Sequence, residues 1–204
     1  MAFMKRLPLS FFSRPTKTVA RELLGKVLVR GRKRARIVET EAYLDGRDAA
    51  SHARFGPQGR SSVMFGPPGK LYVFLVYGMH HCMNVVTERK GTAGAVLLRG
   101  AEILPLGNPN TLYGPGRLCR WLKVTRRENG LDLTDRASGL FLADDGFRPR
   151  RVGVSERIGV DYAGIWAKKK FRYYLPPDQN LRRIRSFAYK TISASHTKRN
   201  RRSN

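Results

Sequence analysis

Short apolar segments alternate with polar residues, glycines and prolines along most of the chain, a pattern typical of β-strands. Residues 26–30 and 36–43 flank a basic turn and predict one hairpin, and residues 83–87 and 93–100 predict a second. Residues 71–78 are apolar at successive positions, which predicts a strand covered on both faces. Shorter strands are expected within residues 139–144, 150–155 and 170–175.

Helical patterns are fewer and shorter. One helix is expected to begin after an N-cap at Thr16 or Thr18, to continue through Leu24 and to stop at Gly25. A second is expected within residues 114–124, entered from a proline and a glycine. Because strands outnumber helices and most are joined by short turns, the sequence predicts a single α+β domain around a largely antiparallel sheet.

The segment from Asp45 to Gly69 carries five glycines and three prolines among polar residues, which predicts a long loop. Long loops in compact domains are usually functional. We place a basic N-terminal arm at residues 1–17, the folded domain at residues 18–180 and a basic, flexible tail at residues 181–204.

Composition narrows the function classes. The 204 residues include 40 Lys and Arg against 15 Asp and Glu, a formal charge of +25, which favours a polyanionic partner such as nucleic acid. A hydrophobic share of 41% is sufficient for one folded core. Two cysteines make neither a disulfide scaffold nor a four-ligand zinc site. With no signal peptide and no apolar run near the ~20 residues of a membrane span, we expect a cytosolic protein without a membrane partner.

Two acidic residues stand on an otherwise apolar strand. Alternation places Glu39, Glu41 and Tyr43 on one face together with Ile37. Acids rarely occupy such positions without a partner. Either each acid forms a structural ion pair with an arginine, or one of them is a general base facing a cleft.

Other chemistries lack their motifs. The His-x-Glu and Cys-x-x-Cys pattern of zinc deaminases, the His-Glu-x-x-His helix and the phosphate-binding glycine loops are all missing, so no metal and no cofactor are expected. Two further alternatives stay open. One is a non-catalytic, basic nucleic-acid-binding protein, and the other is a metal-dependent nuclease that uses Glu39, Glu41, Asp45 and Asp48.

Aromatic residues accompany this basic character at Tyr43, Tyr72, Phe74 and Tyr77. They either pack in the core or stack on nucleobases. At these residues the sequence resembles the alkyladenine (3-methyladenine) DNA glycosylase family over about residues 18–175. The resemblance is carried by residues 36–43, 51–52, 71–86, 95–104, 114–119 and 157–175.

The resemblance implies a curved sheet with a protruding hairpin, and a monofunctional glycosylase acting on double-stranded DNA. Such an enzyme flips alkylated or deaminated purines (3-methyladenine, 7-methylguanine, hypoxanthine, ethenoadenine) out of the duplex, hydrolyses the N-glycosidic bond and so initiates base excision repair. It implies a monomer, nucleoid-associated in a bacterial cytoplasm or nuclear in a eukaryote.

By the same resemblance, Glu41 activates the hydrolytic water and Arg99 helps to hold it. Arg99 is also expected to keep Glu41 ionised at neutral pH. Tyr77 matches the wedge that enters the minor groove and fills the gap left by the flipped nucleotide. These roles require Glu41 to face a cavity wide enough for a nucleobase.

The remaining matches line the base pocket. Tyr43 and His52 match pocket residues, and His52 also matches a contact to the base edge. Asn84 matches the asparagine that crowds out the exocyclic amine of guanine. Phe74 stands where many members have a tyrosine, so stacking is kept and a hydroxyl contact is lost. His80 replaces an aromatic residue next to the wedge.

Overall fold

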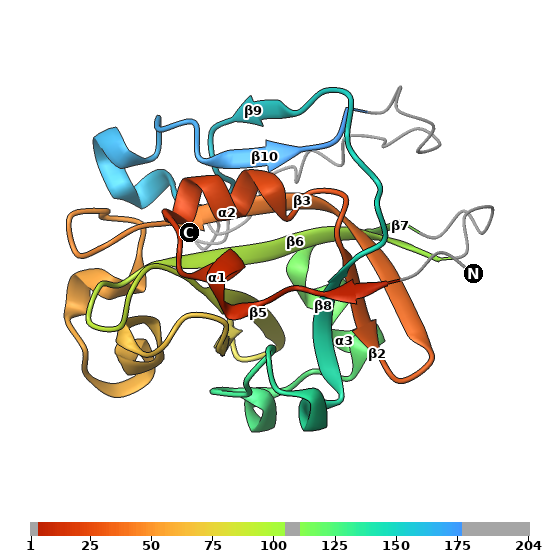
Figure 1. Ribbon diagram of the computed structural model, residues 1–204. Helices are drawn as coiled ribbons and strands as arrows, with labels where there is room; N and C mark the ends of the chain where they lie inside the picture. Colours follow the sequence, from red (N-terminus) through yellow and green to blue (C-terminus); the bar gives the residue numbers. More distant parts are fainter. Residues whose placement is uncertain (1–3, 105–110, 177–204) are drawn as a thin grey trace, which may run out of the picture.

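The computed structural model describes residues 4–104 and 111–176 (Figure 1). In this part of the chain one sheet contains the strands β1 (Lys5–Arg6), β2 (Val27–Arg30), β3 (Lys33–Tyr43), β4 (Leu71–Val76), β5 (His80–Val86), β6 (Ala95–Ile103), β7 (Thr111–Tyr113), β8 (Leu140–Asp144), β9 (Gly153–Ser155) and β10 (Arg172–Tyr174). All neighbouring strands are antiparallel. The predicted α+β fold and the expected hairpins are confirmed.

Few helices accompany the sheet. The α-helices are α1 (Leu9–Phe12), α2 (Thr16–Glu22) and α3 (Pro115–Leu122), and the 3-10 helices are η1 (His52–Phe55), η2 (Gly59–Phe65), η3 (Arg126–Glu128), η4 (Arg136–Ser138) and η5 (Asp161–Trp166). No helix in the described part of the chain is long and apolar enough to cross a membrane. Both predicted α-helices are present.

The main sheet runs in the order β1-β8-β2-β3-β6-β5-β4, with β10 paired to β3 and β7 paired to β6. Strand β3 lies at its centre, because its first residues pair with β2, its later residues pair with β10, and its other edge pairs with β6. Figure 1 shows α2 lying along β3 and β6. Strand β3 is thereby paired with a strand from near each end of the described chain, β2 and β10.

Two compensating bulges interrupt the β3–β6 pairing. Ile37 lies opposite Ala101 and Glu39 opposite Gly100, so Val38 is an extra residue on β3; on β6, Arg99 has no residue opposite. Up to Ile37, the odd-numbered residues of β3 face the helices. From Val38 onward, the even-numbered residues of this strand face them instead. A one-residue shift turns a strand's alternation over. Ile37 is therefore in the core, and the expectation that it shares a face with Glu39 and Glu41 is wrong.

The core lies on the helix side of the sheet. Leu23 of α2 and Leu118 and Leu122 of α3 pack in one apolar cluster with strand residues such as Met83 and Leu98. Thr40 also faces α2, where its hydroxyl donates to the Ala20 carbonyl at 2.8 Å. The helices cover this face, and Glu39 and Glu41 point from the opposite one.

Some local expectations differ from the structure. The N-cap of α2 is Pro15, and Thr16 lies inside the helix, with its hydroxyl 2.8 Å from that of Thr87. The loop from Asp45 to Gly69 contains η1 and η2, since turn-rich sequences also permit short 3-10 helices. In the expected N-terminal arm, β1 pairs with β8 and Phe12 is buried, so these residues pack on the domain. The expected tail at 181–204 lies outside the described residues.

Candidate active site

Strand register brings most of the predicted site residues to one face of the sheet. Glu41 lies opposite Leu97, Leu97 opposite Asn84, and Asn84 opposite Tyr72. Directly opposed residues of antiparallel strands point to the same face. Tyr43 and Phe74 are two residues further along β3 and β4, so they share it. The predicted site residues Glu41, Tyr43, Phe74 and Asn84, from three different strands, are thus brought together on the face that the α-helices leave free.

Glu41 is fully buried and held by three groups. The Tyr43 hydroxyl donates to Oε2 at 2.9 Å, the backbone N–H of Ile158 donates to Oε1 at 3.0 Å, and Nε of Arg99 lies 3.0 Å from Oε1. The carboxylate is thus an ion-pair partner of Arg99 and also an acceptor for two neutral donors.

Arg99 bridges the two acids. Its Nε lies 3.2 Å from Oε1 of Glu39, and the same oxygen accepts a hydrogen bond from Nε of Arg172 at 2.6 Å. The bulge on β6 explains this position, because an unpaired strand residue can aim its side chain away from the regular direction. Glu39 therefore has two arginine partners, whereas Glu41 has one.

Burial raises the pKa of Glu41 above its ordinary value. Arg99, the Ile158 N–H and the Tyr43 hydroxyl each lower this pKa, but the loss of solvation outweighs them. Arg99 acts in the expected direction, but the net direction is upward. A carboxylate with a raised pKa is a better proton acceptor when it is ionised.

The expectation that Glu41 faces an open cavity is not met in this structure. The Glu41 side chain is 1% exposed and is covered by its three partners. The layer above it is thin, because Tyr43 is only partly buried and Ile158 is 40% exposed.

A cluster of three rings adjoins Asn84 on the same face. The rings of His52 and Phe74 meet edge to face with centroids 4.6 Å apart, and the Phe74 and Tyr72 centroids are 5.3 Å apart. Nδ1 of His52 is 2.8 Å from the Tyr72 hydroxyl. Burial, assisted by Arg60 and Arg54, lowers the pKa of His52 to about 4. The imidazole is therefore neutral at pH 7.

Asn84 is buried beneath this cluster. Its Nδ2 donates to the Tyr72 carbonyl at 3.1 Å, which fixes the amide on the strand. The structure thus places Tyr43, His52, Phe74 and Asn84 close to or on the face that carries Glu41.

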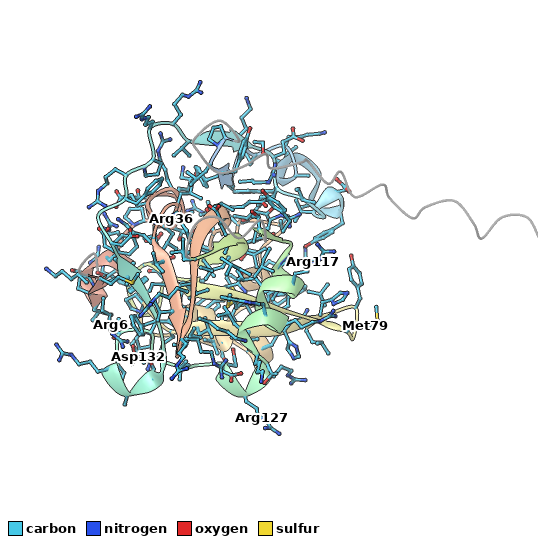
Figure 2. All side chains as sticks on the ribbon, turned by 90° about the vertical axis from the view of Figure 1, so that its right-hand side faces the viewer. Arg6, Arg36, Met79, Arg117, Arg127 and Asp132 are labelled. Carbon is cyan, nitrogen blue, oxygen red and sulfur yellow. The ribbon has the colours of Figure 1, made fainter. Side chains whose placement is uncertain are left out.

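Tyr77 lies apart from these residues, at the tip of the β4–β5 hairpin. It is 85% exposed, and its neighbour Met79 is 70% exposed. Figure 2 shows Met79 projecting beyond the body of the domain. The turn is tight, because Met79 N–H donates to the Val76 carbonyl at 3.1 Å and both Tyr77 and Gly78 have positive φ. These features are typical of a type I′ turn.

Three features of the site were not predicted from the sequence. The Ile158 N–H reaches Glu41 from 117 residues away, and a backbone group has no sequence signal. The fully buried Asp48–Arg157 pair lies next to Tyr43, whose ring centroid is 4.8 Å from the Arg157 guanidinium carbon. Tyr72, for which core packing and base stacking were both open, is buried and also fixes His52.

Among the described residues, no group of three His, Cys, Asp or Glu could hold a metal ion.

Comparisons with known proteins agree on one family. The family described as methylpurine-DNA glycosylase matches residues 10–179. A protein of Anaeromyxobacter dehalogenans strain 2CP-1 is 50% identical over 175 residues, covering 83% of this chain and 82% of its own length. Proteins of Myxococcus xanthus and Methanocella arvoryzae are 47% and 46% identical, covering 87% and 84% of this chain and 94% and 92% of their own lengths. The curated names describe all three as candidate 3-methyladenine DNA glycosylases. The chain therefore belongs to the methylpurine-DNA glycosylase family and is a DNA glycosylase, a hydrolase of N-glycosyl bonds.

Proposed function

We propose that this enzyme flips alkylated or deaminated purines out of duplex DNA and hydrolyses their N-glycosidic bond with a water activated by Glu41. The observation that carries the proposal is the buried Glu41 carboxylate. It lies on the same sheet face as the rings of Tyr43 and Phe74, and a hairpin with an exposed tyrosine extends from that sheet. The proposed catalytic carboxylate, the base-binding rings and the wedge tyrosine thus all belong to one sheet and its hairpin.

The chemistry follows from the charges. A purine alkylated on N3 or N7 is cationic and leaves readily, so one carboxylate can do what glycoside hydrolysis divides between two. Glu41 takes a proton from water and its negative charge favours the oxocarbenium character of the sugar. Neutral His52 adds no repulsion toward a cationic base, and Tyr43 and Phe74 offer cation–π attraction of about 0.5–2 kcal/mol each.

Access to Glu41 requires a local rearrangement. We propose that the incoming nucleotide and water displace the Tyr43 hydroxyl and the Ile158 N–H from the carboxylate, while Arg99 stays. Arg99 is the buried partner and is also held by Glu39, whereas Tyr43 and Ile158 lie at the surface. Asn84, fixed by the Tyr72 carbonyl, then limits which purine edge fits.

The wedge completes the proposed cycle. Base flipping costs a few kcal/mol in unstacking, and Tyr77 offsets this cost by filling the vacated space. The proposed product, an abasic site, is the substrate for the next step of base excision repair. A monomeric state and a bacterial, nucleoid-associated cytoplasmic location stay predictions.

A panel of duplexes tests the proposal. Duplexes carrying 3-methyladenine, 7-methylguanine, hypoxanthine or ethenoadenine are incubated with the protein and EDTA, and released base is measured. We expect release of at least the cationic purines, without a borohydride-trapped adduct, because none of the predicted site residues is a lysine. Binding without release from any duplex supports the alternative of a non-catalytic binding protein, and DNA cleavage that EDTA abolishes supports a metal-dependent nuclease.

A further inference from the structure

A small cavity lies at the base of the hairpin, between the start of β5 and the end of α3. Its volume is about 240 Å³, and its polar lining comes from His80 and His81 of β5, Arg120 of α3, and Lys123 and Thr125 after that helix. Helix α3 packs with Met83 and Leu98 on the core face. The cavity therefore lies where α3 approaches the hairpin that carries Tyr77.

The charged groups of this cavity are unusual. Arg120 and Lys123 are both exposed, and both line the cavity. No acid lines the cavity, and within residues 4–104 and 111–176 neither side chain forms an ion pair. Nearby Arg30, in contrast, is paired with Glu128 at 2.8 Å. Two like charges that line one cavity repel each other.

Lys123 also holds a backbone conformation that is unfavourable for it. Its φ is 58°, the left-handed region that glycine or asparagine usually occupies at a helix end. The conformation directs the chain from α3 toward Thr125. Gly116 at the start of the helix allows a close approach to the hairpin, since a Cβ there would lie 3.1 Å from Cβ of His80. The chain thus bears backbone strain and charge repulsion to form a basic cavity beside the wedge.

We propose that this cavity binds one phosphate of the DNA backbone when Tyr77 is inserted into the duplex. The inference rests on the proposed function, because it requires the hairpin to lie on DNA. The lining supplies a guanidinium, an ammonium, two imidazoles and a hydroxyl, which are groups that contact phosphate oxygens. It contains no Phe, Tyr or Trp on which a base could stack. Anchoring a phosphate next to the wedge holds the duplex while the base is flipped.

The test compares two double variants that each remove two positive charges. The Arg120→Gln/Lys123→Asn protein, called the cavity variant, lacks both basic side chains of the cavity. Asparagine at position 123 accepts the left-handed conformation. Lys5→Gln with Arg136→Gln removes two exposed charges near Arg6, which Figure 2 shows on the opposite side of the molecule from Met79. Both keep net charge matched, so they separate a local contact from long-range attraction.

Affinity for a duplex that carries an abasic site, where Tyr77 can fill the vacated space, is measured across a salt series. For the cavity variant we expect affinity to fall on the order of tenfold at low salt, and the slope of log K against log[salt] to decrease by about one, as for one lost phosphate contact. For the Lys5/Arg136 variant we expect little change in slope. Equal slopes for the two variants overturn the proposal.

Neutral methylphosphonates scanned along both strands locate the contact. We expect one position at which the substitution weakens the wild-type protein but not the cavity variant. The proposal is also overturned if the methylphosphonates weaken binding equally in the wild-type protein and the cavity variant at every position. Base release by the wild-type protein distinguishes this result from a failure of the proposed function, because the phosphate contact is judged from binding alone: absence of release by the wild-type protein refutes glycosylase action on the tested purines.

Discussion

Glu39 and Glu41 share Arg99, yet their surroundings differ. Glu39 is fixed between two arginines, which is the arrangement of a structural ion pair. Glu41 has one arginine and two neutral donors, and burial raises its pKa. Both interpretations left open by the sequence are thus compatible with the site: a structural role for Glu39 and a chemical role, still a proposal, for Glu41.

The raised pKa of Glu41 leads to a prediction for the pH dependence of base release. The proposed base works in its ionised form, so the rate falls as the pH drops through the pKa of Glu41, and a raised pKa brings this fall closer to neutral pH. Arg99 lowers the pKa, so Arg99→Gln is expected to move the fall to still higher pH. This shift of the pH profile is measured from single-turnover rates of base release on 7-methylguanine DNA between pH 4 and 9.

Arg99→Lys serves as the matched control, because it keeps a positive charge near the carboxylate. We expect its pH profile to lie between those of the wild-type protein and Arg99→Gln. A profile of Arg99→Gln that is unchanged, or moved to lower pH, contradicts the assignment of Glu41 as the titrating base.

At the scale of elements, the β4–β5 hairpin keeps Tyr77 in a conformation that suits other residues better. Its φ of 51° lies in the left-handed region, where Asn followed by Gly is the preferred pair for this turn. A large aromatic residue therefore occupies the tip at a cost in stability. Such a cost is expected where the side chain has a task outside the fold.

The Tyr77→Asn variant separates stability from function. We expect it to unfold at equal or higher urea concentration, because asparagine tolerates the positive φ. Base release from duplex DNA is expected to fall by about 5- to 150-fold, corresponding to about 1–3 kcal/mol of lost stacking. Release from single-stranded DNA, which needs no wedge, serves as the control. An equal loss on both substrates contradicts the wedge role.

A second element-scale prediction concerns the buried ion pair between the loop after β3 and the segment before η5. Asp48 and Arg157 are both fully buried and lie 2.6 Å apart. Asp48→Asn leaves a buried arginine without its counter-charge, so we expect a loss of about 3–5 kcal/mol in the free energy of unfolding, measured by urea denaturation.

Asp45→Asn is the control in the same loop, because Asp45 pairs with the exposed Arg47. Exposed pairs contribute little, so we expect its unfolding curve to match that of the wild-type protein. Equal effects of the two substitutions contradict a structural role for the Asp48–Arg157 pair.

At the scale of the whole molecule, hydrophobic alternation and turn residues were sufficient to predict the hairpins, α3 and the fold class. They could not locate the bulges, because an extra strand residue such as Val38 or Arg99 looks like any other in the sequence. Yet these bulges turn Glu39 and Glu41 away from the core and direct Arg99 toward them. Long-range contacts such as Ile158 to Glu41 were equally hidden, since they depend on how the chain returns to β3.

The central claim is that Glu41 activates water for base release, and the Glu41→Gln variant tests it most directly. Its rate on 7-methylguanine duplex DNA is measured in single-turnover conditions with EDTA, alongside the wild-type protein, with DNA binding and unfolding as controls. We predict intact binding and a rate lower by about 10²- to 10⁴-fold. Wild-type-like release by a folded Glu41→Gln protein contradicts the account.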